Sequence, residues 1–261
     1  MKKQITKCKA NVVCLVETRI REDKFQSISD KFLPGWGRAF CFSTQNLCRI
    51  WLLWKVEDIS ITVKCTTSQY LHCSVSLLES KSDYYINFIY ASNEGVDRRQ
   101  LWLDMEDLQA MVANSPLLLA GDFNVIKAPA EKFGGLALDT YEQDFKACTE
   151  AIGIEDHPAV GCYYTWTNRR EDGHFIVKKL DRVLVNHAWY AFFPQCIVQF
   201  LPPGILDHSA ALISIGLSIT LALNLLSFLI IGLIIKISCL GWRKLGLLRL
   251  LVLLCILLLE N

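Results

Sequence analysis

The sequence predicts an α/β fold with one large hydrophobic core. The chain has 261 residues, and 52% of them are hydrophobic, which is enough to bury a sizeable core in one or two domains. Apolar runs of strand length alternate with amphipathic stretches of helix length as far as His208. Several of these runs end in polar residues, as buried strands do when they carry side chains to the rim of a sheet.

The N-terminal half is predicted to form mainly sheet. Residues 11–17 are a short apolar run that ends in Glu17, which is typical of a buried strand. Residues 22–33 place apolar side chains on one helical face, and Pro34-Gly35 ends that helix. Four segments rich in β-branched and aromatic residues follow, spaced like consecutive antiparallel strands: 49–54, 59–64, 70–78 and 84–91.

The C-terminal half alternates helices with strands. Residues 97–113 place four apolar side chains on one helical face: Leu101, Met105, Leu108 and Met111. Residues 116–124 form an apolar strand that ends in polar residues, and residues 140–153 form a second amphipathic helix that stops at a glycine. Short strands are predicted at 162–167 and 174–185.

The formal net charge of +1 is unevenly distributed. Four basic residues and one acid after His208 give that segment a charge of +3, which leaves −2 for the rest of the chain. A slightly acidic body has no broad basic field, so any binding of nucleic acid must rest on a specific site. The 11 cysteines include no Cys-x-x-Cys pair, which argues against a zinc ribbon and favours reduced thiols.

Polar clusters stand at the ends of predicted strands: Glu17, Tyr90 with Asn93, Asp122 with Asn124, and Asp207 with His208. Carboxylates at strand tips on one rim of a sheet supply the oxygen ligands that a hard cation such as Mg²⁺ prefers. A histidine beside them can bind a phosphate oxygen. Each cluster taken alone has an ordinary alternative, such as a solvent-facing carboxylate after a strand. The combination is what indicates a site.

In their order and positions, these clusters resemble the endonuclease/exonuclease/phosphatase superfamily over about residues 11–215. The anchors of the resemblance are Val16-Glu17-Thr18, Ile89-Tyr90-Ala91-Ser92-Asn93, Gly121-Asp122-Phe123-Asn124, Tyr164-Thr165-Trp166-Thr167-Asn168, Lys179-Leu180-Asp181-Arg182 and Leu206-Asp207-His208-Ser209. Gly-Asp-Phe-Asn after an apolar strand is the most specific of these. The fourth and fifth anchors are similar to those of plant LINE-type retrotransposon endonucleases.

The resemblance implies a fold and an activity. The fold would be a four-layer α/β sandwich, two packed mixed β-sheets flanked by helices, within residues 1–215. The activity would be hydrolysis of DNA phosphodiester bonds by in-line attack of water, dependent on Mg²⁺ or Mn²⁺, in a protein that is a monomer. RNA, a nucleotide or a phosphoinositide are alternative substrates, because a fold does not fix a function.

The resemblance also implies roles for individual residues. Glu17 matches a metal-binding glutamate, and Asp207 matches a carboxylate that binds metal or orients the adjacent histidine. Tyr90 matches a tyrosine that packs against the scissile phosphate. Asp122 matches the aspartate that orients or deprotonates the attacking water, and Asn124 matches the asparagine that holds phosphate and water in place.

Three further residues complete the implied site. His208 matches the histidine that stabilises the pentavalent phosphate, and Asp181 and Thr165 match residues that support the constellation. Ordinary structural roles stay open for some of these positions. Thr165 could simply complete a strand, and Asp181-Arg182 could be a surface ion pair of little energetic value. The neighbouring aromatic residues Tyr164 and Trp166 are more often core residues than stacking platforms.

The chain departs from the family at its start. Family members usually open with a strand carrying a Trp-Asn-x-Arg-Gly motif, whose asparagine joins the metal and phosphate network. Met1 to Lys9 contain no equivalent, so we expect a domain without its first strand and with an unpaired sheet edge in its place. Leu206 also stands where a serine is usual. The alternative function is therefore a catalytically dead, degenerate or membrane-associated relic.

The segment 216–261 is predicted to be a hydrophobic helical tail. Ser209 to Ile215 should form the last strand of the domain, which leaves about 217–235 as a possible transmembrane helix. The protein would then be a single-pass membrane protein with its C-terminus in the cytosol. Alternatively, the tail is a frame-shifted continuation of the coding sequence, and the protein is nuclear or cytoplasmic.

Overall fold

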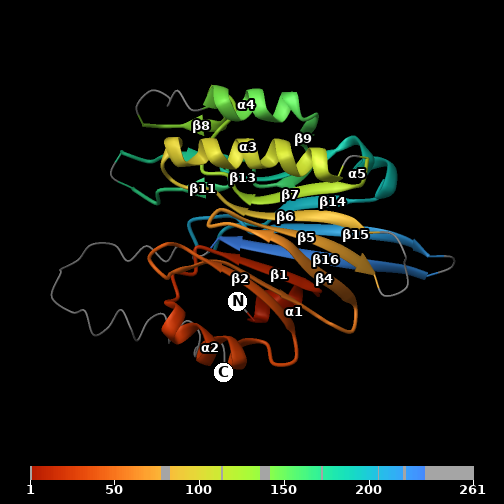
Figure 1. Cartoon of the computed structure of the whole chain (residues 1–261). Helices are drawn as coiled ribbons and strands as arrows, with labels where there is room; N and C mark the ends of the chain where they lie inside the picture. The colour runs from red at the N-terminus through yellow and green to blue at the C-terminus, as the bar shows by residue number, and fades with distance from the viewer. Residues whose placement is uncertain are drawn as a thin grey trace.

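The computed structural model describes residues 2–77, 83–112, 114–135, 142–171, 173–204, 206–219 and 222–232. These residues form four layers (Figure 1). Helices α3 (Gly95–Val112) and α4 (Glu142–Ala151) cover one sheet, and α1 (Lys2–Lys7) and α2 (Glu22–Phe32) cover the other. The predicted arrangement of two packed mixed sheets flanked by helices is confirmed.

One large sheet contains seven strands in the order β10-β14-β15-β16-β1-β3-β2. It is mixed, because β1 pairs in parallel with β16 and β10 in parallel with β14, whereas the other pairs are antiparallel. Its strands are β1 (Val12–Val16), β2 (Gly37–Phe42), β3 (Cys48–Trp54), β10 (Ala159–Gly161), β14 (Ile197–Phe200), β15 (Ala211–Ile219) and β16 (Ala222–Gly232).

The second large sheet contains six strands in the order β4-β5-β6-β7-β13-β9. Strands β6 and β7 are parallel, and the other neighbours are antiparallel. Its strands are β4 (Ile59–Thr66), β5 (Tyr70–Leu77), β6 (Tyr84–Tyr90), β7 (Leu117–Asp122), β9 (Ile154–Asp156) and β13 (Asp181–Asn186). A small third sheet, β11-β12-β8, joins β8 (Lys132–Phe133), β11 (Trp166–Thr167) and β12 (Val177–Lys178). The short helices η1 (Pro129–Glu131) and α5 (His187–Phe192) complete the described elements.

Strand β1 shows why an apolar run without alternation forms a central strand. All five of its residues are buried. Val12, Cys14 and Val16 pack in the core between the two sheets, whereas Val13 and Leu15 pack in the core beneath α1 and α2. A strand that is covered on both faces needs apolar side chains at every position.

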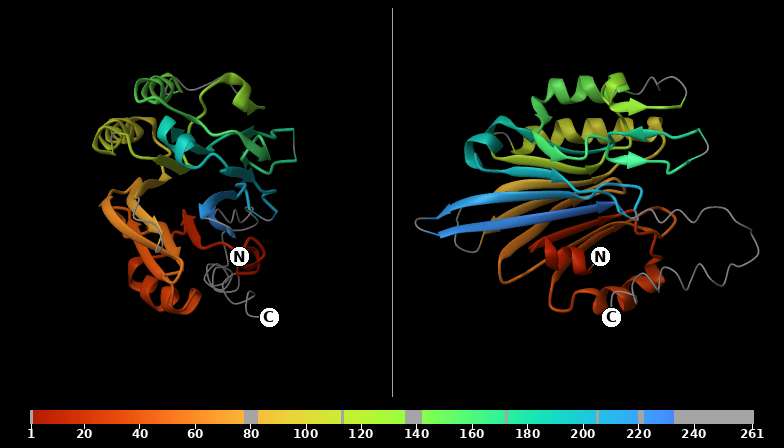
Figure 2. Two further views of the ribbon diagram at one scale, coloured as in Figure 1. Left: turned by 90° about the vertical axis from the view of Figure 1, so that its right-hand side faces the viewer. Right: turned by 180° about the vertical axis from the view of Figure 1, so that it is seen from behind.

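Strand β16 lies beside β1, where the sequence predicts an open edge. Residues 12–16 pair with Phe228–Gly232 on one side and with β3 on the other, so the expectation of an unpaired edge is wrong. The right-hand view in Figure 2 shows β15 and β16 running together as a long pair. The predicted last strand at residues 209–215 is confirmed as part of β15.

The described part of the predicted helical tail is therefore strand, and the large sheet extends past residue 215 to Gly232. The physical reason is that Phe228 to Ile231 are buried on both faces of a central strand. Such a strand needs a continuous apolar run, and in a sequence this run looks like a membrane helix. In the part of the chain that the structure describes, no helix is long and apolar enough to cross a bilayer. Residues 233–261 of the tail lie outside the described residues.

Candidate active site

The tips of β6, β7 and β13 bring three predicted site residues together. The parallel register of β6 and β7 places Tyr90 opposite Asp122, and the antiparallel register of β7 and β13 places Asp122 opposite Asp181. His208 comes from the segment before β15, which forms a bridge with Trp166. The side chains of Asp122, Asp181 and His208 are buried, so a polar cluster is held at the rim of the core.

Gly121 allows β7 to approach β6 closely just before Asp122. Its φ is +144°, a value that residues with a side chain rarely adopt. A Cβ at this position would lie 1.9 Å from the carbonyl oxygen of Ile89. The glycine of the Gly-Asp-Phe-Asn anchor is therefore needed to place Asp122 beside Tyr90.

Two carboxylates hold the imidazole of His208. Its Nδ1 lies 2.9 Å from Oδ2 of Asp181, and its Nε2 lies 4.0 Å from Oδ2 of Asp122. Burial lowers the pKa of His208, but the charges of Asp181 and Asp122 outweigh burial and raise this pKa to about 10. Burial raises the pKa of Asp122 to about 7, against the opposing effect of His208. At neutral pH, His208 is protonated and Asp122 can exchange a proton.

Thr165 fixes the two segments that carry this pair. Its hydroxyl oxygen accepts hydrogen bonds from the backbone N–H groups of Leu180 and Asp181, at 3.0 and 2.9 Å. Its carbonyl oxygen accepts a hydrogen bond of 2.7 Å from the N–H of Ser209. Thr165, which directly precedes β11, thus positions both Asp181 and the segment around His208.

Asn124 is held against both parallel strands. Its backbone N–H donates to Oδ1 of Asp122 at 2.9 Å, and its side-chain amide donates to the carbonyl oxygen of Ala91 at 2.9 Å. Its φ of 51° lies in the left-handed region, which asparagine tolerates better than most residues. The structure therefore brings Asn124 to the same rim as Asp122.

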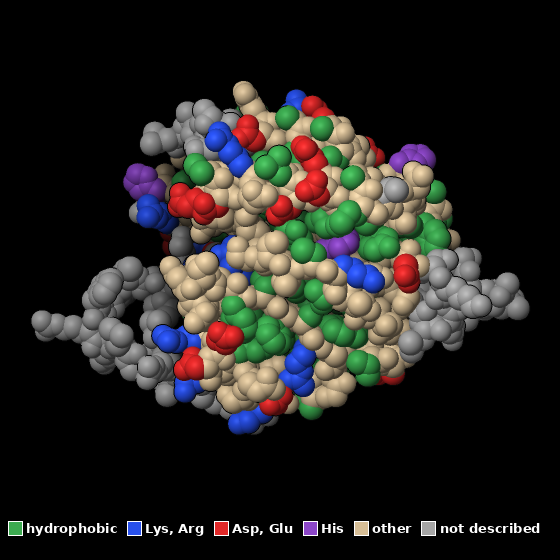
Figure 3. Space-filling view, in the orientation of Figure 1, with side chains coloured by type: hydrophobic (Ala, Val, Ile, Leu, Met, Phe, Trp, Pro, Cys, Tyr) green, Lys and Arg blue, Asp and Glu red, His purple; other side chains and the backbone are tan. Residues whose placement is uncertain are grey.

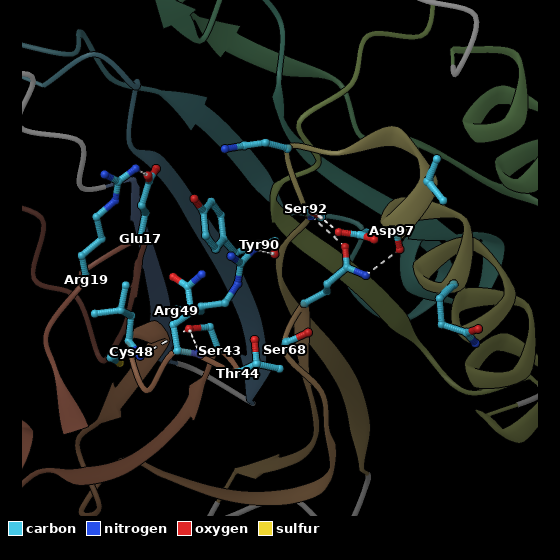
Figure 4. Close-up of a pocket in the computed structure, with 16 residues that line it drawn as sticks. Glu17, Arg19, Ser43, Thr44, Cys48, Arg49, Ser68, Tyr90, Ser92 and Asp97 are labelled. Carbon is cyan, nitrogen blue, oxygen red and sulfur yellow. Dashed lines mark hydrogen bonds and ion pairs between the residues drawn. The ribbon is translucent and has the colours of Figure 1, made fainter. Parts of the chain in front are cut away.

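Glu17 and Tyr90 form the opposite wall of the site (Figure 4). Glu17 directly follows β1, is 5% exposed, and forms an ion pair with Arg19. Glu17 and Arg19 both have positive φ values, a conformation that is often retained at functional sites. Burial raises the pKa of Tyr90, and the charges of Glu17 and Asp122 raise it further, so the phenol stays protonated.

Arg49, which was not among the predicted site residues, also belongs to this wall. Its guanidinium lies over the Tyr90 ring, 4.2 Å from the centroid. Its Nη2 donates to the carbonyl oxygen of Tyr90 at 3.1 Å, and its own carbonyl accepts the N–H of Glu17 at 2.8 Å. The one available signal was a lone arginine in an otherwise apolar strand, a position that charged residues usually avoid.

Asp207 and Asn93 lie at the margins of the site. Asp207 is buried, and its charge contributes to the raised pKa of Arg19, which burial lowers and Glu17 raises more strongly. Asn93 lines a pocket next to Glu17 and Tyr90. All the predicted site residues thus reach this rim or its border.

The donor set fits a hard divalent cation. Among the described residues, the ligand atoms of Asp122, Asp181 and His208 lie within 4.8 Å of one another. A protonated His208 has no lone pair to offer, so carboxylate oxygens are the suitable ligands. Glu17 and Asp207, the predicted metal ligands, lie outside the compact group.

Asp181 and Arg182 do not form a surface ion pair with each other. Asp181 points to His208, whereas Arg182 is completely buried and binds Glu131 and Asp156. The surface-pair alternative is therefore wrong, because alternate residues of β13 face opposite sides of the sheet. Tyr164 and Trp166 are only partly buried, so neither is a fully buried core aromatic residue.

No protein-family model and no curated protein matches the sequence, but solved structures do. The chain is similar to the endonuclease domain of TRAS1, a telomere-specific non-LTR retrotransposon, with a TM-score of 0.58 and 10% identity over 80% of this chain and 99% of that one. An endonuclease/exonuclease/phosphatase family protein from Bacteroides thetaiotaomicron gives 0.53 and 12% over 79% and 81%. The endonuclease/exonuclease/phosphatase from Bacteroides vulgatus gives 0.52 and 14% over 79% and 85%.

At these identities the comparisons establish the fold. The chain has the fold of the endonuclease/exonuclease/phosphatase superfamily, and the resemblance predicted from the sequence is confirmed at that level.

Proposed function

We propose that this chain is a metal-dependent phosphodiesterase that hydrolyses DNA, and that it derives from a plant LINE-type retrotransposon endonuclease. The observation that carries the proposal is the buried cluster of Asp122, Asp181 and His208, in which the imidazole is charged and Asp122 has a pKa of about 7. Displaced pKa values of this kind are characteristic of groups that exchange protons in catalysis.

The side chains have complementary tasks in this reaction. Asp122 orients a water molecule and accepts its proton, and Asn124, fixed on Asp122 and Ala91, keeps water and phosphate aligned. His208, held by Asp181, donates a hydrogen bond to the phosphate oxygen that gains charge. The phenol of Tyr90 packs against the phosphate from the other wall.

Glu17 and Asp207 would hold Mg²⁺ or Mn²⁺, together with an oxygen of the Asp122 and Asp181 pair. When bound, the cation supplies positive charge that neutralises the phosphate.

DNA is the proposed substrate because one of the similar structures is a retrotransposon endonuclease. Acidic and basic side chains are interspersed on the face drawn in Figure 3, which agrees with recognition at a local site rather than by a broad basic field. We propose a monomer. Membrane association was predicted for the tail 216–261, and it is kept only as an alternative proposal.

A catalytically dead relic is the second candidate, and one observation favours it. Strand β16 ends with Gly232 opposite Val16, next to Glu17, and a glycine brings no oxygen ligand to the rim. The family places an asparagine at the tip of its first strand in this region. A chain that folds but lacks one ligand would keep the pocket without the activity.

Nicking of supercoiled plasmid by the full chain distinguishes the two candidates. The proposed enzyme nicks the plasmid in Mg²⁺ or Mn²⁺ and not in EDTA, and Asp122→Asn and His208→Ala each lower the rate by at least about 100-fold. A folded chain that nicks in neither metal ion supports the relic instead.

A further inference from the structure

A pocket of about 820 Å³ adjoins the site on the Glu17 side (Figure 4). Its walls come from the tip of β1, the turn between β2 and β3, the turn between β4 and β5, and the start of α3. The volume lies within the range of about 300–1,000 Å³ that is usual for small-ligand sites. The pocket therefore has the size of a nucleotide site rather than of a duplex groove.

The pocket and the candidate active site share two side chains. Glu17 and Tyr90 line the pocket, and they also face the cluster around Asp122. Tyr90 lies beside Asp122 and lines the pocket, so a polynucleotide whose scissile phosphate lies at the rim formed by Asp122 and His208 can continue past Tyr90. Its next nucleotide then reaches the mouth of this pocket.

Arg49 stands at the junction of pocket and site. Its guanidinium is fixed over the ring of Tyr90 and by the carbonyl oxygens of Tyr90 and Ala91, at 3.1 and 3.4 Å from Nη2. Arg49 lines the pocket and is only partly buried. A guanidinium that is held in one orientation at the wall of a pocket is a suitable donor for a phosphate oxygen.

Several other lining residues are polar and partly pre-ordered. Gln69 accepts a hydrogen bond from the N–H of Ser92 at 2.7 Å and donates one to the carbonyl oxygen of Asp97 at 3.0 Å. Thr44 and Asn93 add a hydroxyl and an amide to the walls. Such groups bind the sugar and the base edges of an unpaired nucleotide.

We propose that this pocket binds an unpaired nucleotide next to the scissile phosphate, and that Arg49 contacts the phosphate that joins them. The proposal rests on the proposed function, because the active site defines the scissile position. A base must leave its pair and its stack to enter a pocket, and this costs least in a strand that is already single. The pocket therefore selects single-stranded or locally opened nucleic acid over intact duplex.

Filling the pocket tests the proposal without touching the catalytic cluster. Val96 lines the pocket and is 63% exposed, whereas Val56 is 51% exposed and lies in the turn between β3 and β4. We expect Val96→Trp to raise the Kd of the full chain for a fluorescent single-stranded oligonucleotide at least about tenfold, and Val56→Trp to leave it unchanged. Fluorescence anisotropy in EDTA measures binding in the absence of cleavage.

Arg49→Lys tests the phosphate contact. Lysine keeps the positive charge but lacks the planar guanidinium with its several N–H donors. We therefore expect a higher Kd for the single-stranded oligonucleotide and a smaller difference in Kd between single strand and duplex. The proposal is overturned if Val96→Trp binds as tightly as the unmodified chain, if Val56→Trp weakens binding equally, or if intact duplex binds as tightly as single strand.

A separate assay shows whether the proposed function itself holds. Hydrolysis of bis(p-nitrophenyl) phosphate in Mg²⁺ reports the chemistry on a substrate without nucleotides. Failure of this hydrolysis refutes the proposed function, whereas the anisotropy series still decides whether the pocket binds an unpaired nucleotide.

Discussion

Burial controls the charges of the residues that matter most in this protein. His208 keeps its proton because two buried carboxylates face its two nitrogens, and Asp122 resists ionisation because it is buried beside other acids. The sequence indicated Asp122 through its position after an apolar strand, and His208 through the Asp-His pair that precedes another predicted strand. It could not indicate Arg49, because the contact of this residue with Tyr90 joins β3 to β6 across the fold. A local sequence pattern cannot predict a contact between residues so far apart in the chain.

Asp181→Asn should lower the pKa of His208. The folded-state pKa is about 10, and removal of an adjacent charge shifts a pKa by about 1 to 3 pH units. NMR titration of the His208 ring measures the change, and the exposed His187 in the same spectra is the internal control. An unchanged His208 pKa would show that Asp181 does not hold the proton.

The same pair makes stability depend on pH. Because the folded-state pKa of His208 is raised, its stabilising contribution is complete below its unfolded value of about 6.5 and is lost as the pH rises through about 10. We expect the loss of unfolding free energy between pH 7 and pH 10.5 to be smaller in His208→Gln than in the unmodified chain. Urea denaturation at the two pH values measures it, and equal losses would contradict the account.

Arg182 is a structural residue, and its removal should be costly. It is completely buried between Glu131 and Asp156, so Arg182→Met leaves buried carboxylates without their main partner and costs about 3–5 kcal/mol. Arg99→Met is the matched control, because the ion pair of Arg99 with Asp144 is largely exposed and is worth about 0–1 kcal/mol. Equal denaturation midpoints for the two variants would refute this assignment.

Among the elements, the three predicted helices and most of the predicted strands occur close to their predicted bounds, but two strand predictions are wrong in extent. The strand predicted at 162–167 is limited to β11, and the strand predicted at 174–185 is divided into β12 and β13, which lie in different sheets. The helical face of α3 was predicted less accurately, because Met111 is exposed and Val112 is buried in its place near the helix end. Strand β16 was misread because a central strand and a membrane helix are both continuously apolar. Only the pairing of β16 with β1 and β15 shows that this run is a strand and not a helix. The partner β1 lies at the other end of the described chain, so the pairing could not be predicted from the local sequence.

A chain that ends at residue 216 should lose its cooperative fold. Deleting β16 removes four buried apolar side chains, Phe228 to Ile231, from the core. Burial of each such side chain contributes about 1.5–3 kcal/mol to the free energy of unfolding. The total is comparable to the whole stability of a typical domain, about 5–15 kcal/mol. Calorimetry of the chain ending at residue 232 provides the control, and we expect it to retain a single unfolding transition. A chain ending at 216 that unfolds at the same temperature would show that β16 is dispensable.

For the whole molecule, the order of the anchors along the chain was sufficient to predict the fold, because most anchors lie at the ends of strands in the two large sheets and the topology fixes which ends meet. Acidic and basic side chains are interspersed on the face drawn in Figure 3, so under the proposed function the substrate is recognised at the rim itself. The sequence did not predict that the C-terminal strand β16 joins β15 to β1 inside the large sheet. That arrangement depends on pairing between residues near the two ends of the described chain.

The proposed function requires the rim around Asp122 and His208 to direct water onto a phosphodiester. Cleavage of a DNA oligonucleotide by the full chain in H₂¹⁸O with Mg²⁺, followed by mass spectrometry of the fragments, tests this requirement. We expect one ¹⁸O atom in the terminal phosphate for each cut, and no cuts by Asp122→Asn. Intact DNA in both Mg²⁺ and Mn²⁺, or equal cleavage by Asp122→Asn, would contradict it.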